Sequence, residues 1–263
     1  MVSHAAIAGL VIQALIAALI PIAAFTYLNR KYSISLRPIA VGVMVFIAFS
    51  QVFEPALNAY ILNVNPITAV IKNNPYWYAL YGALAAGVFE EIGRYAGFMI
   101  FLGENRERKD GLAYGLGHGG IEALLVGLMS SIQSMISANL INSGQFDAIY
   151  SKTASPEMIA SVKNSLEALT LTNGLFGGIE RIGAFLLQVA LSLLVLYAIN
   201  SKKLHYVGLA ILLHTAFNFV AVYHKTIGLN IVIAEVFIII MAIVSVLYIR
   251  KTKEEHTKEK EAE

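Results

Sequence analysis

The sequence predicts an all-α protein that crosses a membrane several times. The chain has 263 residues, of which 57% are hydrophobic and only 14% are charged, whereas charged residues make up about a quarter of an ordinary soluble domain. The hydrophobic residues occur in runs of about 20 or more, which is the length that a helix needs to cross a bilayer. Strands of an outer-membrane barrel are shorter and alternate in polarity, so these runs indicate a polytopic helix bundle.

Seven helices are expected to cross the membrane. The first hydrophobic run has no basic region before it and no small-residue cleavage site after it, so it is predicted to be a retained span and not a signal peptide. The expected spans are Ala5–Tyr27, Ile39–Leu62, Tyr76–Leu102, Gly111–Ile136, Asn173–Ile199, Tyr206–Tyr223 and Gly228–Ile249.

The positions of the basic residues predict the orientation. Lysine and arginine cluster after the first, third, fifth and seventh runs, whereas the opposite connections hold only Lys72, Lys152, Lys163 and Lys225. Connections on the cytoplasmic side carry the excess of basic residues in membrane proteins. The N-terminus is therefore expected outside and the C-terminus in the cytoplasm, in a multi-pass protein of the cell membrane.

A single transmembrane bundle is expected over residues 1–250, with its catalytic core at about 76–223. The one long connection, 137–172, is expected outside the cell. In it, the triplet that begins at Ser155 has proline at the first helical position, and the apolar residues that follow recur at helical spacing, which predicts a short amphipathic helix on the membrane surface. Residues 251–263 are expected to form a charged cytoplasmic tail.

Three ionisable residues interrupt the third hydrophobic run: Glu90, Glu91 and Arg94. A charge near the middle of a bilayer is costly unless it is paired or wetted, so such residues mark functional sites by default. On a helix, Arg94 lies four residues from Glu90 and three from Glu91, and it reaches either of them. One guanidinium cannot neutralise two carboxylates, so one glutamate is left over.

Two further helices each present a histidine and a second polar residue one turn away. The fourth run contains His118 and Glu122, with glycines between them that allow a neighbouring backbone to approach. The sixth run contains His214 and Asn218. From the helical rise, these histidines, Glu90 and Asn218 are expected at compatible depths between the cytoplasmic surface and the midplane.

Other polar residues in the spans are expected to be mainly structural. Glu180 and Arg181 are adjacent, so their side chains leave the fifth helix on different faces. Glu54 precedes Pro55 and is placed to satisfy backbone groups that a proline kink would free. A single histidine or a single Glu–Arg pair is also commonly structural, so the catalytic interpretation rests on their combination.

This combination allows two kinds of hydrolytic chemistry. A glutamate and a histidine can together polarise a water molecule, with the glutamate as general base, while His214 and Asn218 can donate hydrogen bonds to the oxyanion. Alternatively, Glu90, His118 and His214 supply the two histidines and one glutamate of a catalytic zinc site. The usual zinc signature, His-Glu-x-x-His, is absent from the sequence.

Other catalytic classes are disfavoured. The chain has no cysteine, which excludes thiol catalysis, disulfides and cysteine-bound metal. It lacks the Gly-x-Ser-x-Gly motif of many serine hydrolases. Both aspartates, Asp110 and Asp147, are expected in loops, which argues against an aspartyl dyad. The formal net charge of +2 is too small to indicate a nucleic-acid partner.

Four motifs in this order resemble the YhfC-type intramembrane proteases, which are relatives of the CAAX-prenyl proteases and bacteriocin-processing membrane enzymes. The motifs are Glu-Glu-x-x-Arg-Tyr from Glu90, Gly-His-Gly-Gly-x-Glu from Gly117, Glu-Arg from Glu180 and His-x-x-x-Asn from His214. The relatives commonly have one more residue before the arginine. The resemblance therefore leaves open which glutamate pairs with Arg94.

The resemblance implies roles for most of these residues, without a metal cofactor. Glu90 would be the base and His118 its partner, and the site would open toward the cytoplasm. His214 and Asn218 would stabilise the oxyanion. Glu91 and Arg94 would be the orienting pair. The resemblance gives no role for Glu122, which is expected either to orient His118 or to take the place of Glu91. Glu180 and Arg181 are expected to support the site from outside.

The expected function is therefore that of a glutamic intramembrane peptidase acting on a membrane-associated peptide or protein. Its expected partners are membrane lipid and that substrate, and nothing in the sequence specifies a prenyl group. Two other functions stay open: a non-catalytic membrane scaffold or chaperone of the same fold, and a proton-coupled transporter. The transporter would require a symmetric repeat with broken helices, which the sequence does not show.

Overall fold

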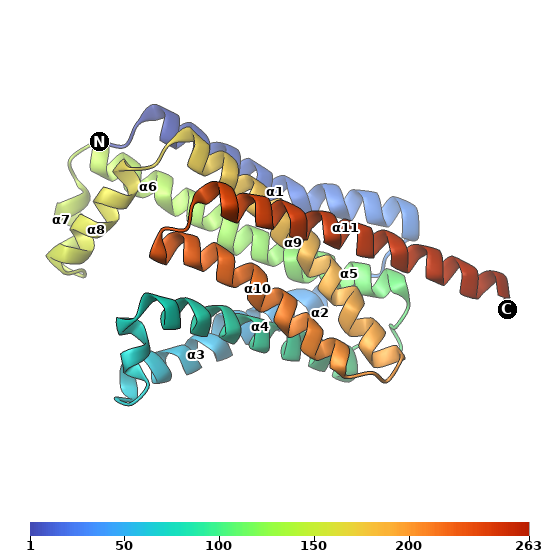
Figure 1. The fold of residues 1–263 in the computed structure, drawn as a ribbon. Coiled ribbons are helices and arrows are strands. Elements are labelled where there is room, and N and C mark those ends of the chain that lie inside the picture. The colour runs from blue at the N-terminus through green and yellow to red at the C-terminus, as the bar shows by residue number, and fades with distance from the viewer. Residues whose placement is uncertain (263) are drawn as a thin grey trace. The chain divides into compact units, whose positions relative to one another are not determined.

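The structure is a computed structural model that describes residues 1–262, including their side chains except those of 224–227 and 253–262. Every regular element in this part of the chain is a helix (Figure 1), which confirms the predicted all-α class. The elements are α1 (His4–Tyr32), α2 (Leu36–Phe46), η1 (Ile47–Phe53), α3 (Glu54–Ala59), η2 (Tyr60–Val64), η3 (Ala69–Asn73), α4 (Pro75–Ile100), α5 (Arg108–Glu122), η4 (Ala123–Met129), α6 (Ser130–Asn142), α7 (Phe146–Tyr150), α8 (Pro156–Glu167), α9 (Leu171–Asn200), α10 (His205–Ile227) and α11 (Ile231–Ala262).

Six helical stretches of the described chain are long and apolar enough to cross a membrane. They are His4–Tyr32, Leu36–Val64, Arg108–Asn142, Leu171–Asn200, His205–Tyr223 and Ile231–Thr252. These stretches coincide with six of the seven expected spans. The remaining expected span, Tyr76–Leu102, corresponds to α4. This helix has 26 residues but is less apolar because it carries Glu90, Glu91 and Arg94. The outside position of the N-terminus stays a prediction.

The second of these stretches is not a regular α-helix. Its middle turn, η1, is a π-helix, and α3 begins directly after it with Pro55 in the first turn. Proline has no N–H and its ring collides with the carbonyl group four residues earlier, so the hydrogen-bond register must change upstream of it. Single π-helical turns of this kind often occur at functional sites.

The chain divides into two compact units. The first comprises Met1–Ile22 and Glu122–Ile182, and the second comprises Ala23–Ile121 and Gly183–Glu263. The second unit contains α2, α4, α10 and α11 and six of the ionisable residues singled out above, namely Glu54, Glu90, Glu91, Arg94, His118 and His214. Glu122, Glu180 and Arg181 belong to the first unit.

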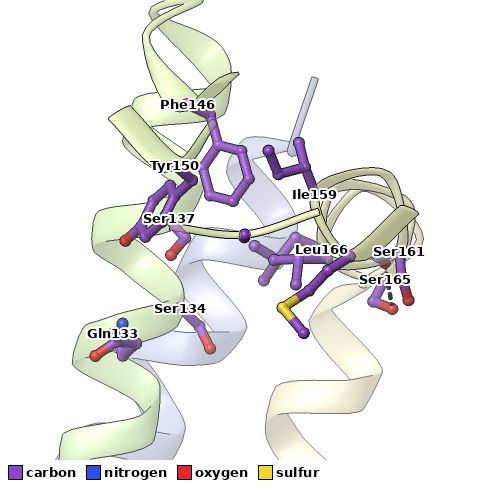
Figure 2. A pocket seen from close by; sticks show the side chains of 12 residues that line it. Gln133, Ser134, Ser137, Phe146, Tyr150, Ile159, Ser161, Ser165 and Leu166 are labelled. Atoms are coloured by element: carbon purple, nitrogen blue, oxygen red, sulfur yellow. Dashed lines mark hydrogen bonds between the residues drawn. The ribbon is translucent and has the colours of Figure 1, made fainter. Parts of the chain in front are cut away.

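The first unit contains the long connection between the fourth and fifth spans. Ser155 caps α8 by accepting a hydrogen bond from the backbone N–H of Met158, at 3.3 Å. A hydrophobic cluster ties α6, α7 and α8 to the start of α1, and a cavity of about 460 Å³ lies between α6, α7 and α8 (Figure 2). Phe146 and Tyr150 of α7 are among its lining residues.

Glycines in the second unit allow helices to touch beside the polar residues. A Cβ atom on Gly42 of α2 would lie 2.9 Å from the backbone nitrogen of His118 in α5. A Cβ atom on Gly87 of α4 would lie 3.1 Å from the carbonyl oxygen of Ile211 in α10. Both distances are too short for a side chain, so these glycines set the close approach of α2 to α5 and of α4 to α10.

Both aspartates of the chain lie at the starts of helices, contrary to the prediction from the sequence. Asp110 and Asp147 do not lie in loops, because they occupy the first turns of α5 and α7. Asp110 accepts a hydrogen bond from the backbone N–H of Glu107 at 3.0 Å, so it satisfies a donor at the helix start. The expected charged tail, 251–263, falls largely on side chains outside the described part of the chain.

Candidate active site

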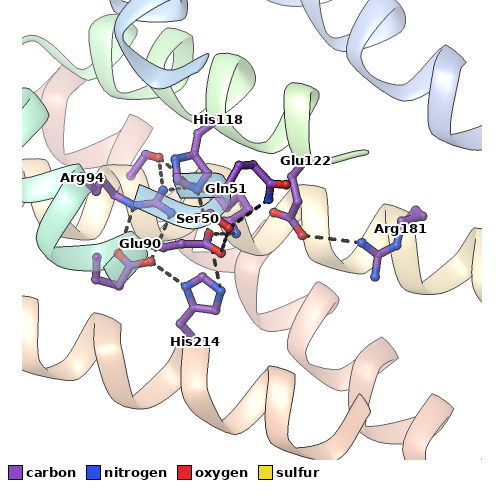
Figure 3. A network of polar contacts seen from close by, with 11 residues as sticks. Ser50, Gln51, Glu90, Arg94, His118, Glu122, Arg181 and His214 are labelled. Carbon is purple, nitrogen blue, oxygen red and sulfur yellow. Dashed lines mark hydrogen bonds and ion pairs between the residues drawn. The ribbon is translucent and has the colours of Figure 1, made fainter. Parts of the chain in front are cut away.

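The carboxylate of Glu90 lies against the imidazole of His118 inside the second unit. Glu90 is 5% exposed and His118 is fully buried. Glu90 Oε2 and His118 Nε2 are 2.9 Å apart (Figure 3). Two further side chains donate to the same carboxylate: Gln188 Nε2 to Oε2 at 3.1 Å, and Ser50 Oγ to Oε1 at 3.3 Å. Four helical segments, η1, α4, α5 and α9, therefore meet at Glu90.

The neighbouring Glu91 belongs to a different set of contacts. Its Oε2 lies 3.0 Å from Arg94 Nε, and its Oε1 accepts from Arg94 Nη2 at 3.1 Å. Arg94 also donates to the backbone oxygen of Gln188 at 2.7 Å, to the side-chain oxygen of Gln188 and to the hydroxyl of Ser192. Both members of the ion pair are fully buried. The arginine is thus held by α9 and neutralises Glu91, and Glu90 is the glutamate that faces His118.

His214 of α10 lies between the two glutamates. Its Nδ1 is 2.8 Å from Glu91 Oε1, and its Nε2 is 3.8 Å from Glu90 Oε2. The ring is 2% exposed. The two glutamates of α4 thus each contact one histidine closely, and His214 connects the two sets of contacts.

The directions of these hydrogen bonds fix the arrangement of protons. A guanidinium only donates, so Gln188 must present its oxygen to Arg94 and its NH₂ group to Glu90. Glu91, which is paired with Arg94, accepts at Oε1, so His214 donates from Nδ1. This tautomer follows from the network. With Nδ1 directed at Glu91, Nε2 is the ring nitrogen of His214 that faces Glu90.

Glu122 ends α5, one helical turn after His118 on the same helix. Histidine nitrogen and carboxylate oxygen are ligands of divalent transition metals. Glu122 also pairs with Arg181, with 3.5 Å between Oε1 and Nη1. The adjacent Glu180 is half-buried on α9.

The structure brings some of the expected site residues together and leaves one apart. Glu90, Glu91, Arg94, His118 and His214 form one connected network. Asn218 is half-buried on α10, one turn from His214. Among the side chains that the structure describes, it makes no hydrogen bond to the glutamates or histidines of this network.

Three residues of the network were not anticipated from the sequence: Ser50, Gln188 and Ser192. Gln188 and Ser192 are polar residues four apart in an otherwise apolar stretch of α9, and both are buried. That spacing is a signal that sequence reasoning missed, since buried polar side chains in a span need partners. Ser50 carries no such signal, because its contact with Glu90 depends on the π-helical turn.

Comparisons with known proteins show the family of the chain. A family model described as YhfC intramembrane metalloprotease matches residues 16–252. The "Uncharacterized membrane protein YhfC" of Bacillus subtilis (strain 168) is 37% identical over 254 residues, which cover 96% of this chain and 98% of the relative. No solved structure matches the chain. The resemblance that the motifs indicated is confirmed, and the chain belongs to the YhfC intramembrane metalloprotease family.

Proposed function

We propose that the protein hydrolyses peptide bonds of membrane-associated substrates at a site formed by Glu90, His118 and His214. The observation that carries the proposal is the buried contact between the Glu90 carboxylate and the His118 imidazole, with His214 Nε2 nearby. Membership of a family described as metalloproteases supports a protease activity.

Two pairs of donor atoms lie at distances that a shared divalent metal ion allows. Zinc ligands at about 2.1 Å in a tetrahedral site lie about 3.4 Å from one another. The distances from Glu90 Oε2 to His118 Nε2 and to His214 Nε2 are 2.9 and 3.8 Å, which lie on either side of that value. The family to which the chain belongs is described as metalloproteases, which also favours a bound metal. The zinc alternative is therefore preferred to the metal-free mechanism that the sequence favoured.

Glu90, His118 and His214 would hold the ion, and Glu122, one turn after His118 in the sequence, is the competing third ligand to be tested. A zinc ion bound there supplies an activated water molecule and polarises the peptide carbonyl group. Glu91 accepts from His214 Nδ1 and thereby holds the ring with Nε2 toward Glu90. Carboxylates that orient metal-bound histidines in this way also increase their basicity.

Arg94 and Gln188 complete the support of the ligands. Arg94 neutralises Glu91, so the carboxylate that orients His214 is not an uncompensated charge inside the membrane. Gln188 donates to Glu90 and accepts from Arg94, which fixes the plane of the Glu90 carboxylate. We place the site in the cytoplasmic half of the bilayer, because the basic residues of the connections predict that orientation.

Reconstituted protein tests the function. A single-span peptide in liposomes should be cleaved by the wild type, and the Glu90→Ala and His118→Ala variants should lose about 10³-fold or more in rate, because each change removes a ligand. Glu104→Ala, which changes an exposed glutamate, is the matched control and should retain full activity. The function proposed here is wrong if the Glu90 and His118 variants cleave as fast as the wild type.

The metal is tested separately from the cleavage. A strong chelator should abolish cleavage, and added zinc should restore it. Purified Glu122→Gln protein should keep stoichiometric metal, whereas His214→Ala protein should lose it. The opposite pattern in these two variants would assign the third ligand to Glu122.

A further inference from the structure

A line of polar groups runs along the contact between α3 and α4, outside the ligand set described above. Asn58 Nδ2 donates to Glu54 Oε1 at 3.2 Å, and the Tyr81 hydroxyl donates to Asn58 Oδ1 at 2.6 Å. All three side chains are partly buried. In helices of membrane-spanning length, such groups line a wetted or protein-covered path and do not face lipid.

Two hydrogen bonds fix how α3 and the preceding π-helical turn lie against α4. Ser50 donates to Glu90, and Tyr81 donates to Asn58. The chain therefore runs antiparallel to α4, and Glu54 lies midway between these two contacts. Positions four residues apart are about 6 Å apart along a helix, so Glu54 lies about one turn from the contact with Glu90.

Small residues of α4 lie at the level of Glu54. The antiparallel register places Ala85 and Ala86 opposite it, and Gly82 follows one turn further on, where a Cβ atom would meet nothing within 4 Å. Glu54 is therefore next to a part of α4 that offers space and no charge.

Glu54 also differs from the other glutamates near the site in the charge of its partner. Glu91 is neutralised by Arg94, and Glu122 pairs with Arg181. The hydrogen-bond partner of Glu54 is the neutral amide of Asn58. Asn58 therefore holds the Glu54 carboxylate by a hydrogen bond without adding a charge.

We propose that Glu54 is the proton-transfer group of the peptidase site, an inference that rests on the function proposed above. As the water oxygen bonds to the peptide carbonyl carbon, Glu54 takes the proton that the water loses. It returns that proton to the amide nitrogen as the C–N bond breaks. The products are a carboxylic acid and an amine, so no other proton donor or acceptor is needed. Asn58 and Tyr81 hold the carboxylate in place.

The titratable groups that act on Glu54 come from two neighbouring helices. Tyr81 and Glu90 lie on α4, and His214 lies on α10. The rate should rise with pH as Glu54 becomes ionised. Replacing Glu54 alone should remove this rise of the rate with pH. Changes in rate that arise from the ionisation of Tyr81, Glu90 or His214 should remain.

The test compares Glu54→Gln and Glu54→Asp with wild-type protein in liposomes. Glu54→Gln keeps an acceptor for Asn58 but cannot carry the proton, so kcat should fall by about 10²–10⁴-fold. Its KM and its metal content should equal those of the wild type, and its pH–rate profile should lose the rise described above. Glu54→Asp keeps a carboxylate, so its kcat should lie between those of Glu54→Gln and the wild type. Glu104→Gln, the same change at an exposed position, should be fully active.

Each other outcome overturns the inference. A Glu54→Gln protein that cleaves within about threefold of the wild type shows that no proton passes through Glu54. Loss of metal from that variant makes Glu54 a ligand or a structural residue. If the wild-type protein does not cleave, the proposed function and this inference are both wrong. If the wild-type and Glu54→Gln proteins are both fully active, only this inference is wrong.

Discussion

Replacing Arg94 by methionine should be among the most destabilising single changes in the second unit. The guanidinium and the Glu91 carboxylate are both fully buried. Removing one member of a buried ion pair leaves an uncompensated charge, which costs about 3–5 kcal/mol. Arg94 also donates to Gln188 and Ser192, so those acceptors lose their donor as well. We therefore expect the free energy of unfolding to fall toward the upper end of that range.

The assay is unfolding in mixed detergent micelles, followed by circular dichroism. Lys163→Met provides the control, because Lys163 and Asp147 form an ion pair of similar length whose side chains are 32% and 61% exposed. Exposed pairs contribute about 0–1 kcal/mol. The double variant Glu91→Gln/Arg94→Met removes both charges and should recover much of the loss. If Arg94→Met costs no more than Lys163→Met, the buried pair does not hold the site together.

Three further changes test the packing and the supports of the site. Gly42→Ala should lower the free energy of unfolding by about 1–3 kcal/mol, because the new methyl group would overlap the backbone of α5 beside His118. Gly82→Ala, where nothing lies within 4 Å, should instead stabilise its helix by about 0.5–1 kcal/mol; equal effects in the same unfolding assay would contradict the account. Gln188→Leu should weaken metal binding by about 10–100-fold in a metal titration, whereas Gln133→Leu, at an exposed residue, should bind as the wild type does. Zinc at about 100 times its Kd should stabilise the wild-type protein by about 2.7 kcal/mol over the chelated protein, and an unchanged unfolding midpoint would argue against a site that forms only on folding.

Hydropathy predicted the spans well because length and apolarity are local properties of the sequence. Five of the expected spans lie within helices that are a few residues longer, and the last one, Gly228–Ile249, begins three residues before its helix. The exception is α4. This helix is less apolar because it carries three charged residues of the candidate site. The π-helical turn before Pro55 was not predicted, since hydrophobic periodicity does not report a change of hydrogen-bond register.

The sequence narrowed the site to a few residues but left one pairing open. The spacing on a helix allows Arg94 to reach either Glu90 or Glu91. The structure pairs Arg94 with Glu91, because α9 holds the rest of the guanidinium through Gln188. This choice depends on a contact between residues 94 positions apart, and no local pattern in the sequence encodes it.

The ligand set of the bound metal is the measurement that tests the central claim most directly. Metal content and X-ray absorption of the purified wild-type protein should show one zinc ion per chain, bound by two imidazole nitrogens and at least one carboxylate oxygen. His118→Ala and His214→Ala proteins should each lose that ion. A wild-type protein that cleaves its substrate at full rate after complete removal of metal would contradict the claim and favour the metal-free mechanism, in which Glu90 and His118 activate the water.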